Sequence, residues 1–176
     1  MNVISPIKSI DEINLIKDLY QRKKQIPELV MFTLAINTGI ELSDLLNLKI
    51  KDVKNKFYLH IDKKKVIQLN EETRKLLANY TTGKLNSDFL FKNKKDKKLD
   101  RTTVFYSFKE ICSELGLNGR YSVASWRKTF AYHYYKKYKD LSFLMWLFNQ
   151  NSIERALSFI GETENMNLRF REGVSL

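Results

Sequence analysis

The sequence predicts an α+β fold that is mostly helical and carries one small antiparallel β-sheet. Apolar residues recur at helical spacing over most of the 176 residues. Two short segments alone, residues 56–61 and 66–69, combine strand character with the proximity that a hairpin needs. The six glycines and two prolines are too few for an all-β chain with many turns.

The first half of the chain begins with predicted helices. Ser9 is a capping residue followed by acidic residues, so a helix is expected to about residue 24. Pro27 suits the first turn of a second helix, and residues 29–36 are apolar on almost every side, which predicts a central place in the core. Gly39 is expected to end this helix in a left-handed conformation. Leucines over residues 42–48 indicate a short third helix.

The middle of the chain contains the predicted sheet. Residues 56–61 and 66–69 are expected to be strands joined by the turn Asp62–Lys65. Asn70 is expected to cap a helix that runs through Tyr80, and residues 89–91 are a further short strand candidate.

The second half is predicted to be helical after one basic loop. Residues 92–98 hold five lysines and one aspartate and are expected to form an exposed, mobile loop, which could still supply nonspecific affinity for a polyanion. Asp100 is expected to cap a helix to about residue 115, and further helices are expected over residues 122–138, 141–148 and 152–160. No repeat or linker interrupts the pattern, so we expect one domain over residues 1–176.

The charge balance favours a polyanionic partner. Thirty-one Lys and Arg face twenty Asp and Glu, giving a net charge of +11, and such an excess attracts double-stranded DNA or RNA and releases counterions on binding. An anionic membrane surface is a weaker alternative, and a merely soluble basic protein stays open. No apolar run reaches the roughly 18 residues of a membrane span, and no secretory signal is visible. With the single Cys112, this leads us to expect a cytoplasmic protein without disulfides. The two histidines lack ligand spacing, so no metal or other cofactor is expected.

Three segments in register carry a resemblance to a known family. They are FTLAINTGIELSDLLNLKIKDV at residues 32–53, SWRKTFAYHYYK at 125–136 and LFNQNSIERALSFIG at 147–161. Together they resemble the catalytic domain of tyrosine recombinases of the phage-integrase type from low-GC Gram-positive bacteria. The resemblance implies the tyrosine-recombinase catalytic fold, an origin in a prophage or mobile element, and the absence of the family's N-terminal DNA-binding (core-binding) domain.

The resemblance also identifies the positions of the family's reaction centre. Family members attack a phosphodiester with a tyrosine, while arginines and His or Lys groups stabilise the charge that develops and move protons. A guanidinium fork suits this task because it matches two phosphoryl oxygens. At the matching positions this chain has Glu41, Ala124, Arg127, Gln150 and Phe159, and among these only the arginine at Arg127 agrees with the family's pattern.

These substitutions predict a loss of the family's activity. We expect a protein that does not cleave DNA and is not an enzyme, with Glu41 paired to Arg127 in the pocket that holds phosphate in the family. The expected role is that of a DNA-binding transcription regulator, a repressor or a lysogeny-control protein. The alternatives are an accessory factor in recombination, an active recombinase with an unorthodox site, and an interaction module that no longer binds DNA.

The expected DNA contacts follow from the family's use of one helix in the major groove. The residues concerned are Arg101, Thr102, Thr103 and Tyr106 at the start of that helix, Lys63, Lys64 and Lys65 on the hairpin, and Arg127 with Lys128. The competing interpretation of residues 100–103 is an ordinary capped helix start, and that of the hairpin lysines is a solvated turn. Residues 162–176 form a tail that packs on a neighbouring protomer in the family or folds back in cis, so a homo-oligomer is also an open expectation.

Overall fold

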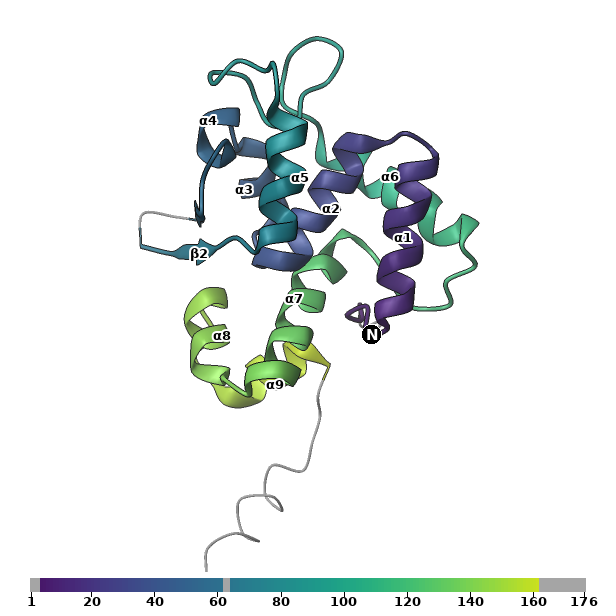
Figure 1. The fold of residues 1–176 in the computed structure, drawn as a ribbon. Helices are drawn as coiled ribbons and strands as arrows, with labels where there is room; N and C mark the ends of the chain where they lie inside the picture. Colours follow the sequence, from purple (N-terminus) through teal and green to yellow (C-terminus); the bar gives the residue numbers. More distant parts are fainter. Residues whose placement is uncertain (1–3, 62–63, 162–176) are drawn as a thin grey trace, which may run out of the picture.

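The structure is a computed structural model, and it describes residues 4–61 and 64–161. Helices make up most of it, and they pack around a central helix (Figure 1). In chain order the elements are α1 (Ile10–Arg22), α2 (Ile26–Thr38), α3 (Leu42–Asn47), α4 (Ile50–Val53), β1 (Tyr58–His60), β2 (Val66–Gln68), α5 (Glu71–Thr81), α6 (Arg101–Glu114), α7 (Val123–Tyr138), α8 (Leu141–Phe148) and α9 (Ile153–Ile160). This order confirms the predicted α+β class.

Helix starts are fixed by local hydrogen bonds that the sequence predicted. The side chains of Ser9 and Asn70 accept hydrogen bonds from backbone N–H groups in the first turns of α1 and α5. Asp100 does the same at the start of α6. Ser122 caps α7 in the same way, where the sequence predicted the helix but not its cap. These caps satisfy donors that have no partner inside a helix, so each helix begins where its capping residue stands.

The sheet is a two-stranded antiparallel hairpin, as expected. Tyr58 pairs with Gln68, Leu59 with Ile67, and His60 with Val66. The expected strand at residues 89–91 is absent, because Phe89 makes only an isolated bridge to Lys49. The partner of Phe89 lies in the irregular turn between α3 and α4, so no ladder can extend from it.

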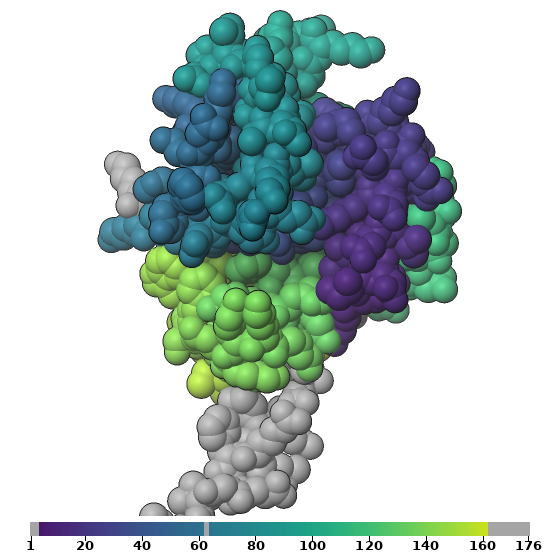
Figure 2. Space-filling model, in the orientation of Figure 1, coloured from purple at the N-terminus to yellow at the C-terminus, as the bar shows by residue number. Residues whose placement is uncertain are grey.

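The core forms around α2, whose side chains are buried on almost every side. The ring of Phe32 lies 6.0 Å from that of Phe108 and 5.7 Å from that of Trp126, which joins α2 to α6 and α7. A second cluster, with Leu144 and Leu157 buried in it, joins α7, α8 and α9. Figure 2 shows these green C-terminal helices closing the underside of the body that the earlier elements form.

At the end of α2, the backbone at Gly39 packs closely against α7. Gly39 has φ of +68°, which a glycine adopts without strain. A Cβ atom added there would lie 2.7 Å from Cδ1 of Phe130 on α7. Gly39 therefore lets the chain turn sharply toward α3 while α7 stays packed against it. Within the described residues, no helix is long and apolar enough to cross a membrane.

Candidate nucleic-acid interface

A cavity of about 350 Å³ lies where the starts of α3, α6 and α7 meet α9. Four of the five family positions line it, namely Glu41, Ala124, Arg127 and Phe159. Arg101, from the start of α6, lines it as well. The structure thus brings together residues that lie far apart in the sequence, as the resemblance implied.

Local structure positions the two charged residues of this cavity. Glu41 stands directly before α3 in an extended conformation, two residues after the turn at Gly39. Arg127 lies in the second turn of α7, which Ser122 starts through a reciprocal pair of hydrogen bonds with Ser125. The two side chains therefore approach each other from the beginnings of two different helices.

Arg127 is held on two sides. Its Nη1 donates to Oε1 of Glu41, so the expected ion pair is present. Its guanidinium carbon lies 4.5 Å from the ring centre of Phe148, a cation–π contact. The side chain of Arg127 is 22% exposed and that of Glu41 is 52% exposed, so the carboxylate is the outer member of the pair.

The ion pair with Glu41 does not use every N–H donor of Arg127. A guanidinium carries five N–H donors in a fixed fork. The Nε of Arg127 is buried and has no hydrogen-bond partner in the described part of the chain. Glu41 thus neutralises the charge of Arg127 through Nη1, while the buried Nε keeps no partner among the residues that the structure describes.

Phe159, on α9, lines the same cavity. Its ring lies 4.9 Å from that of Phe148, which in turn supports Arg127. The ammonium of Lys128 lies 5.5 Å from the ring of Phe159. This Nζ donates to the carbonyl of Ile4 at 2.8 Å, and burial lowers the pKa of Lys128. Lys128 therefore ties the N-terminal segment to α7, and its expected support of DNA contacts stays a prediction.

The start of α6 continues the cavity outward. A second hollow of about 350 Å³ is lined by Arg101, Thr102 and Tyr106 together with Phe105 and residues of the α3 and α7 starts. Arg101 lines both spaces, so they adjoin. Tyr106 is 62% exposed. Thr103 is exposed but lines neither hollow, so it is not grouped with its neighbours.

Asp100 places a carboxylate beside these exposed residues. Its Oδ1 accepts from the backbone N–H of Thr102 at 2.7 Å. Hydrogen bonds from the backbone and side chain of Thr102 hold the pKa of Asp100 below its usual range. Asp100 is therefore ionised at neutral pH and occupied in capping, which leaves Arg101 as the charged residue that projects from this end.

The hairpin lysines do not act as one group. Lys65 is buried, and its Nζ donates to the carbonyl of Leu147 at 3.1 Å and to Oδ1 of Asn149 at 2.6 Å. It joins the start of β2 to the end of α8, so the structure places Lys65 within the fold, and its expected phosphate contact stays a prediction. Lys64 is exposed, and Lys63 lies outside the described residues.

Two features of the site could not be read from the sequence. Gln150 lines neither hollow, and its backbone N–H donates to the carbonyl of Met145. Phe148 supports both Arg127 and Phe159, although the sequence showed it only as an apolar residue within the third segment. Within the described residues, no cluster of three or more His, Cys, Asp or Glu could hold a metal ion.

Comparisons with known proteins identify the family of this chain. The model of the phage integrase family matches residues 9–160. The chain is 29% identical over 171 residues to the probable integrase/recombinase YoeC of Bacillus subtilis (strain 168), covering 94% of this chain and 93% of that protein. It is also 29% identical over 131 residues to tyrosine recombinase XerA of Saccharolobus solfataricus, covering 71% of this chain and 42% of that protein.

Solved structures share the fold. The crystal structure of XerA recombinase superposes with a TM-score of 0.75 at 19% identity, covering 94% of this chain and 62% of that chain. The Tn1549 transposon integrase in complex with circular intermediate DNA gives a TM-score of 0.77 at 14% identity, with coverages of 97% and 64%. The XerH recombinase bound to its difH substrate gives 0.70 at 18% identity, with coverages of 89% and 50%. The expected tyrosine-recombinase catalytic fold is confirmed, and the chain spans less than two thirds of these solved chains.

One expectation is contradicted by these comparisons. The sequence led us to expect that the chain is not an enzyme, because the nucleophile position holds Phe159. Both relatives are named as recombinases, which are enzymes, and nothing in the structure shows an absence of activity. The substitutions at the family positions therefore describe how this site is built and do not establish that it is inert.

Proposed function

Because the chain belongs to the phage integrase family, we propose that it binds double-stranded DNA and acts in site-specific DNA recombination. The observation that carries this proposal is the continuous surface around Arg101, which lines both the Glu41–Arg127 cavity and the hollow at the start of α6. We place the duplex on this surface, so that the family's reaction-centre positions and the start of α6 contact the same stretch of DNA.

The chemistry of the α6 start suits a nucleic acid. Arg101 offers a guanidinium fork for a phosphate or a guanine edge, and Thr102 and Tyr106 offer hydroxyl groups. All three side chains are exposed. The net charge of +11 adds a general attraction for the phosphate backbone.

The Glu41–Arg127 pair gives this surface a neutral centre. A carboxylate at the position where the family has an arginine repels a phosphate, whereas a second guanidinium would attract it. DNA binding by this chain therefore depends more on the α6 start than on the cavity. This makes Arg101 the residue whose alteration is most informative.

The test is a binding measurement on the full chain. We expect Arg101→Glu to weaken binding to a duplex by at least about tenfold at low salt, and to alter the preference among duplex sequences. A circular dichroism spectrum and melting profile unchanged from the wild type serve as the control for folding. Failure of the wild-type protein to bind any duplex at low salt would overturn the proposal.

Regulation is a second candidate role, because part of the α6 start lies outside the cavity. Since Thr102 and Tyr106 lie outside the Glu41–Arg127 cavity, a sequence can be recognised there whatever happens in the cavity. This supports regulation of a prophage or mobile element as a second candidate, and an accessory role at recombination sites as a third. Footprinting over genomic fragments separates them, because protection at a promoter favours regulation and protection at attachment-like sites favours recombination.

Strand cleavage and assembly need measurements of their own. A suicide substrate that traps a covalent protein–DNA adduct would assign cleavage to this chain itself.

We also propose a homo-oligomer on DNA, since two linked DNA-binding surfaces hold a duplex more firmly than one. The tail at residues 162–176, which suggested such an assembly, lies outside the described residues. The mass of the protein–DNA complex in solution tests it.

A further inference from the structure

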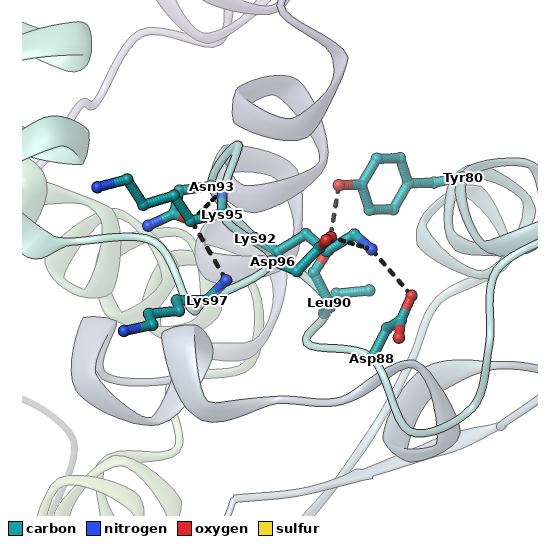
Figure 3. A network of polar contacts seen from close by, with 8 residues as sticks. All are labelled: Tyr80, Asp88, Leu90, Lys92, Asn93, Lys95, Asp96 and Lys97. Carbon is teal, nitrogen blue, oxygen red and sulfur yellow. Dashed lines mark hydrogen bonds and ion pairs between the residues drawn. The ribbon is translucent and has the colours of Figure 1, made fainter.

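The basic segment at residues 92–98, expected as a mobile loop, is exposed but has a defined hairpin geometry. Lys92 and Lys98 form an antiparallel bridge at its base, and the backbone N–H of Asn93 donates to the carbonyl of Lys97 at 2.7 Å. Oδ1 of Asn93 accepts from the backbone N–H groups of Lys95 at 2.9 Å and Lys97 at 3.2 Å. One asparagine side chain thus closes the turn from inside (Figure 3).

The base of this hairpin is anchored by charge. Nζ of Lys92 lies 3.0 Å from Oδ2 of Asp88 and 2.8 Å from Oδ1 of Asp96. The Tyr80 hydroxyl donates to the carbonyl of Leu90 at 3.1 Å, which joins the hairpin base to α5. Both aspartates of residues 88–98 are therefore paired with Lys92 (Figure 3).

The other side of the hairpin carries unneutralised positive charge. Residues 88–98 contain five Lys and two Asp, a net charge of +3. Lys94, Lys95 and Lys97 are exposed, and within the described chain no ion pair joins them to a carboxylate. Figure 3 shows the side chains of Lys95 and Lys97 extending away from Lys92 and its aspartates. The hairpin thus presents three ammonium groups from a fixed backbone.

Its position relates it to the proposed DNA surface. Lys98 donates from Nζ to Oδ1 of Asn47 at 3.0 Å, and Asn47 is the last residue of α3. Glu41, at the other end of α3, lines the cavity. Six residues of helix span about 9 Å, and α6 begins only three residues after Lys98. A duplex turn is about 34 Å long, so the base of the hairpin lies well within one turn of a duplex placed over the cavity.

We propose that this hairpin, through Lys94, Lys95 and Lys97, holds backbone phosphates of double-stranded DNA flanking the segment contacted by the start of α6. The inference rests on the proposed function and extends the proposed DNA surface from the start of α6 to the hairpin. Ammonium groups on long stems suit phosphates as point charges and carry no base preference. The hairpin therefore adds affinity that is independent of sequence, while the start of α6 supplies selectivity.

The experiment replaces all three lysines by glutamine in the full chain and measures binding to a fluorescent duplex over a range of salt concentrations. We expect binding at low salt to weaken by about tenfold or more, equally for preferred and random sequences. The slope of log K against log salt should become shallower by about 2 to 3, since each lost phosphate contact removes about 0.9. The matched control is the triple variant Lys24→Gln, Lys137→Gln and Lys139→Gln, which removes the same charge from other exposed positions.

Two results would overturn the inference. One is a hairpin variant that binds with the same affinity and salt slope as the control variant while the wild type binds well. The other is chemical acetylation of Lys94, Lys95 and Lys97 at the same rate with and without DNA, whereas protection by DNA supports the inference. A wild-type protein that binds no duplex would instead overturn the proposed function itself, so the two failures are distinguishable.

Discussion

Removing the negative charge of Glu41 should increase the affinity of the protein for DNA. In Glu41→Gln, Arg127 loses its ion-pair partner and its guanidinium becomes available to a phosphate oxygen. Two unit charges about 4 Å apart interact by about 4 kcal/mol at an effective dielectric of about 20 and by about 1 kcal/mol in water. Because the Glu41 side chain is 52% exposed, the lower value applies, and about 1 kcal/mol corresponds to roughly fivefold in Kd.

The assay is fluorescence anisotropy with a duplex at several salt concentrations. We expect the Kd of Glu41→Gln to fall by about fivefold, and the salt slope to steepen by about 0.9 as Arg127 takes one phosphate. The matched control is Glu71→Gln, which removes the same charge and breaks an exposed ion pair with Lys75 on α5. The free energy of unfolding should change by at most about 1 kcal/mol in either variant.

Equal affinities of Glu41→Gln and Glu71→Gln for DNA would refute the reasoning, because the gain would then be a general charge effect. A second check is the double variant Glu41→Gln with Arg127→Gln, in which the gain should disappear. Its persistence would show that Arg127 is not the group that receives the phosphate.

Two further predictions concern stability and reactivity. Lys65→Met should lower the free energy of unfolding in urea by about 1–3 kcal/mol, since the Leu147 carbonyl and the Asn149 side chain lose a donor; Lys56→Met, at an exposed position, should change it by less than about 0.5 kcal/mol. Equal effects of the two variants would contradict the buried role of Lys65. Burial raises the pKa of the Cys112 thiol from its ordinary value of 9.0 to about 11, so a thiol reagent at pH 8 should react much more slowly with native protein than with protein unfolded in urea. Because the raised pKa favours the neutral thiol in the fold, its contribution to stability is complete below about pH 9 and declines as the pH rises toward 11. Native and unfolded reaction rates that agree would show that the thiol is accessible.

The elements that could be predicted from sequence are those fixed by nearby residues. Ser9, Asn70, Asp100 and Ser122 start helices through hydrogen bonds within two or three residues, so a short stretch of sequence contains the whole cause. The left-handed turn at Gly39 is equally local. The Glu41–Arg127 pair was predictable for another reason, namely that the resemblance placed both positions at one phosphate.

The features that escaped prediction depend on distant partners. Lys65 is buried because the end of α8, 82 residues away in sequence, brings two acceptors to its ammonium. Phe89 forms no strand because its partner segment between α3 and α4 is irregular. The order of residues 92–98 depends on two ion pairs of Lys92 and on one side-chain amide, whereas the composition of the segment suggested only a solvated loop.

The most direct test of the central claim, that duplex DNA lies over the start of α6 and the adjoining cavity, is site-specific photocrosslinking. A photoreactive phenylalanine analogue is placed at Tyr106, which is exposed beside Arg101, or at Leu15, which is exposed on α1 and lines neither hollow. We expect irradiation with bound duplex to crosslink the protein efficiently from position 106 and weakly from position 15. Equal crosslinking from both positions, or stronger crosslinking from position 15, would contradict the proposed surface.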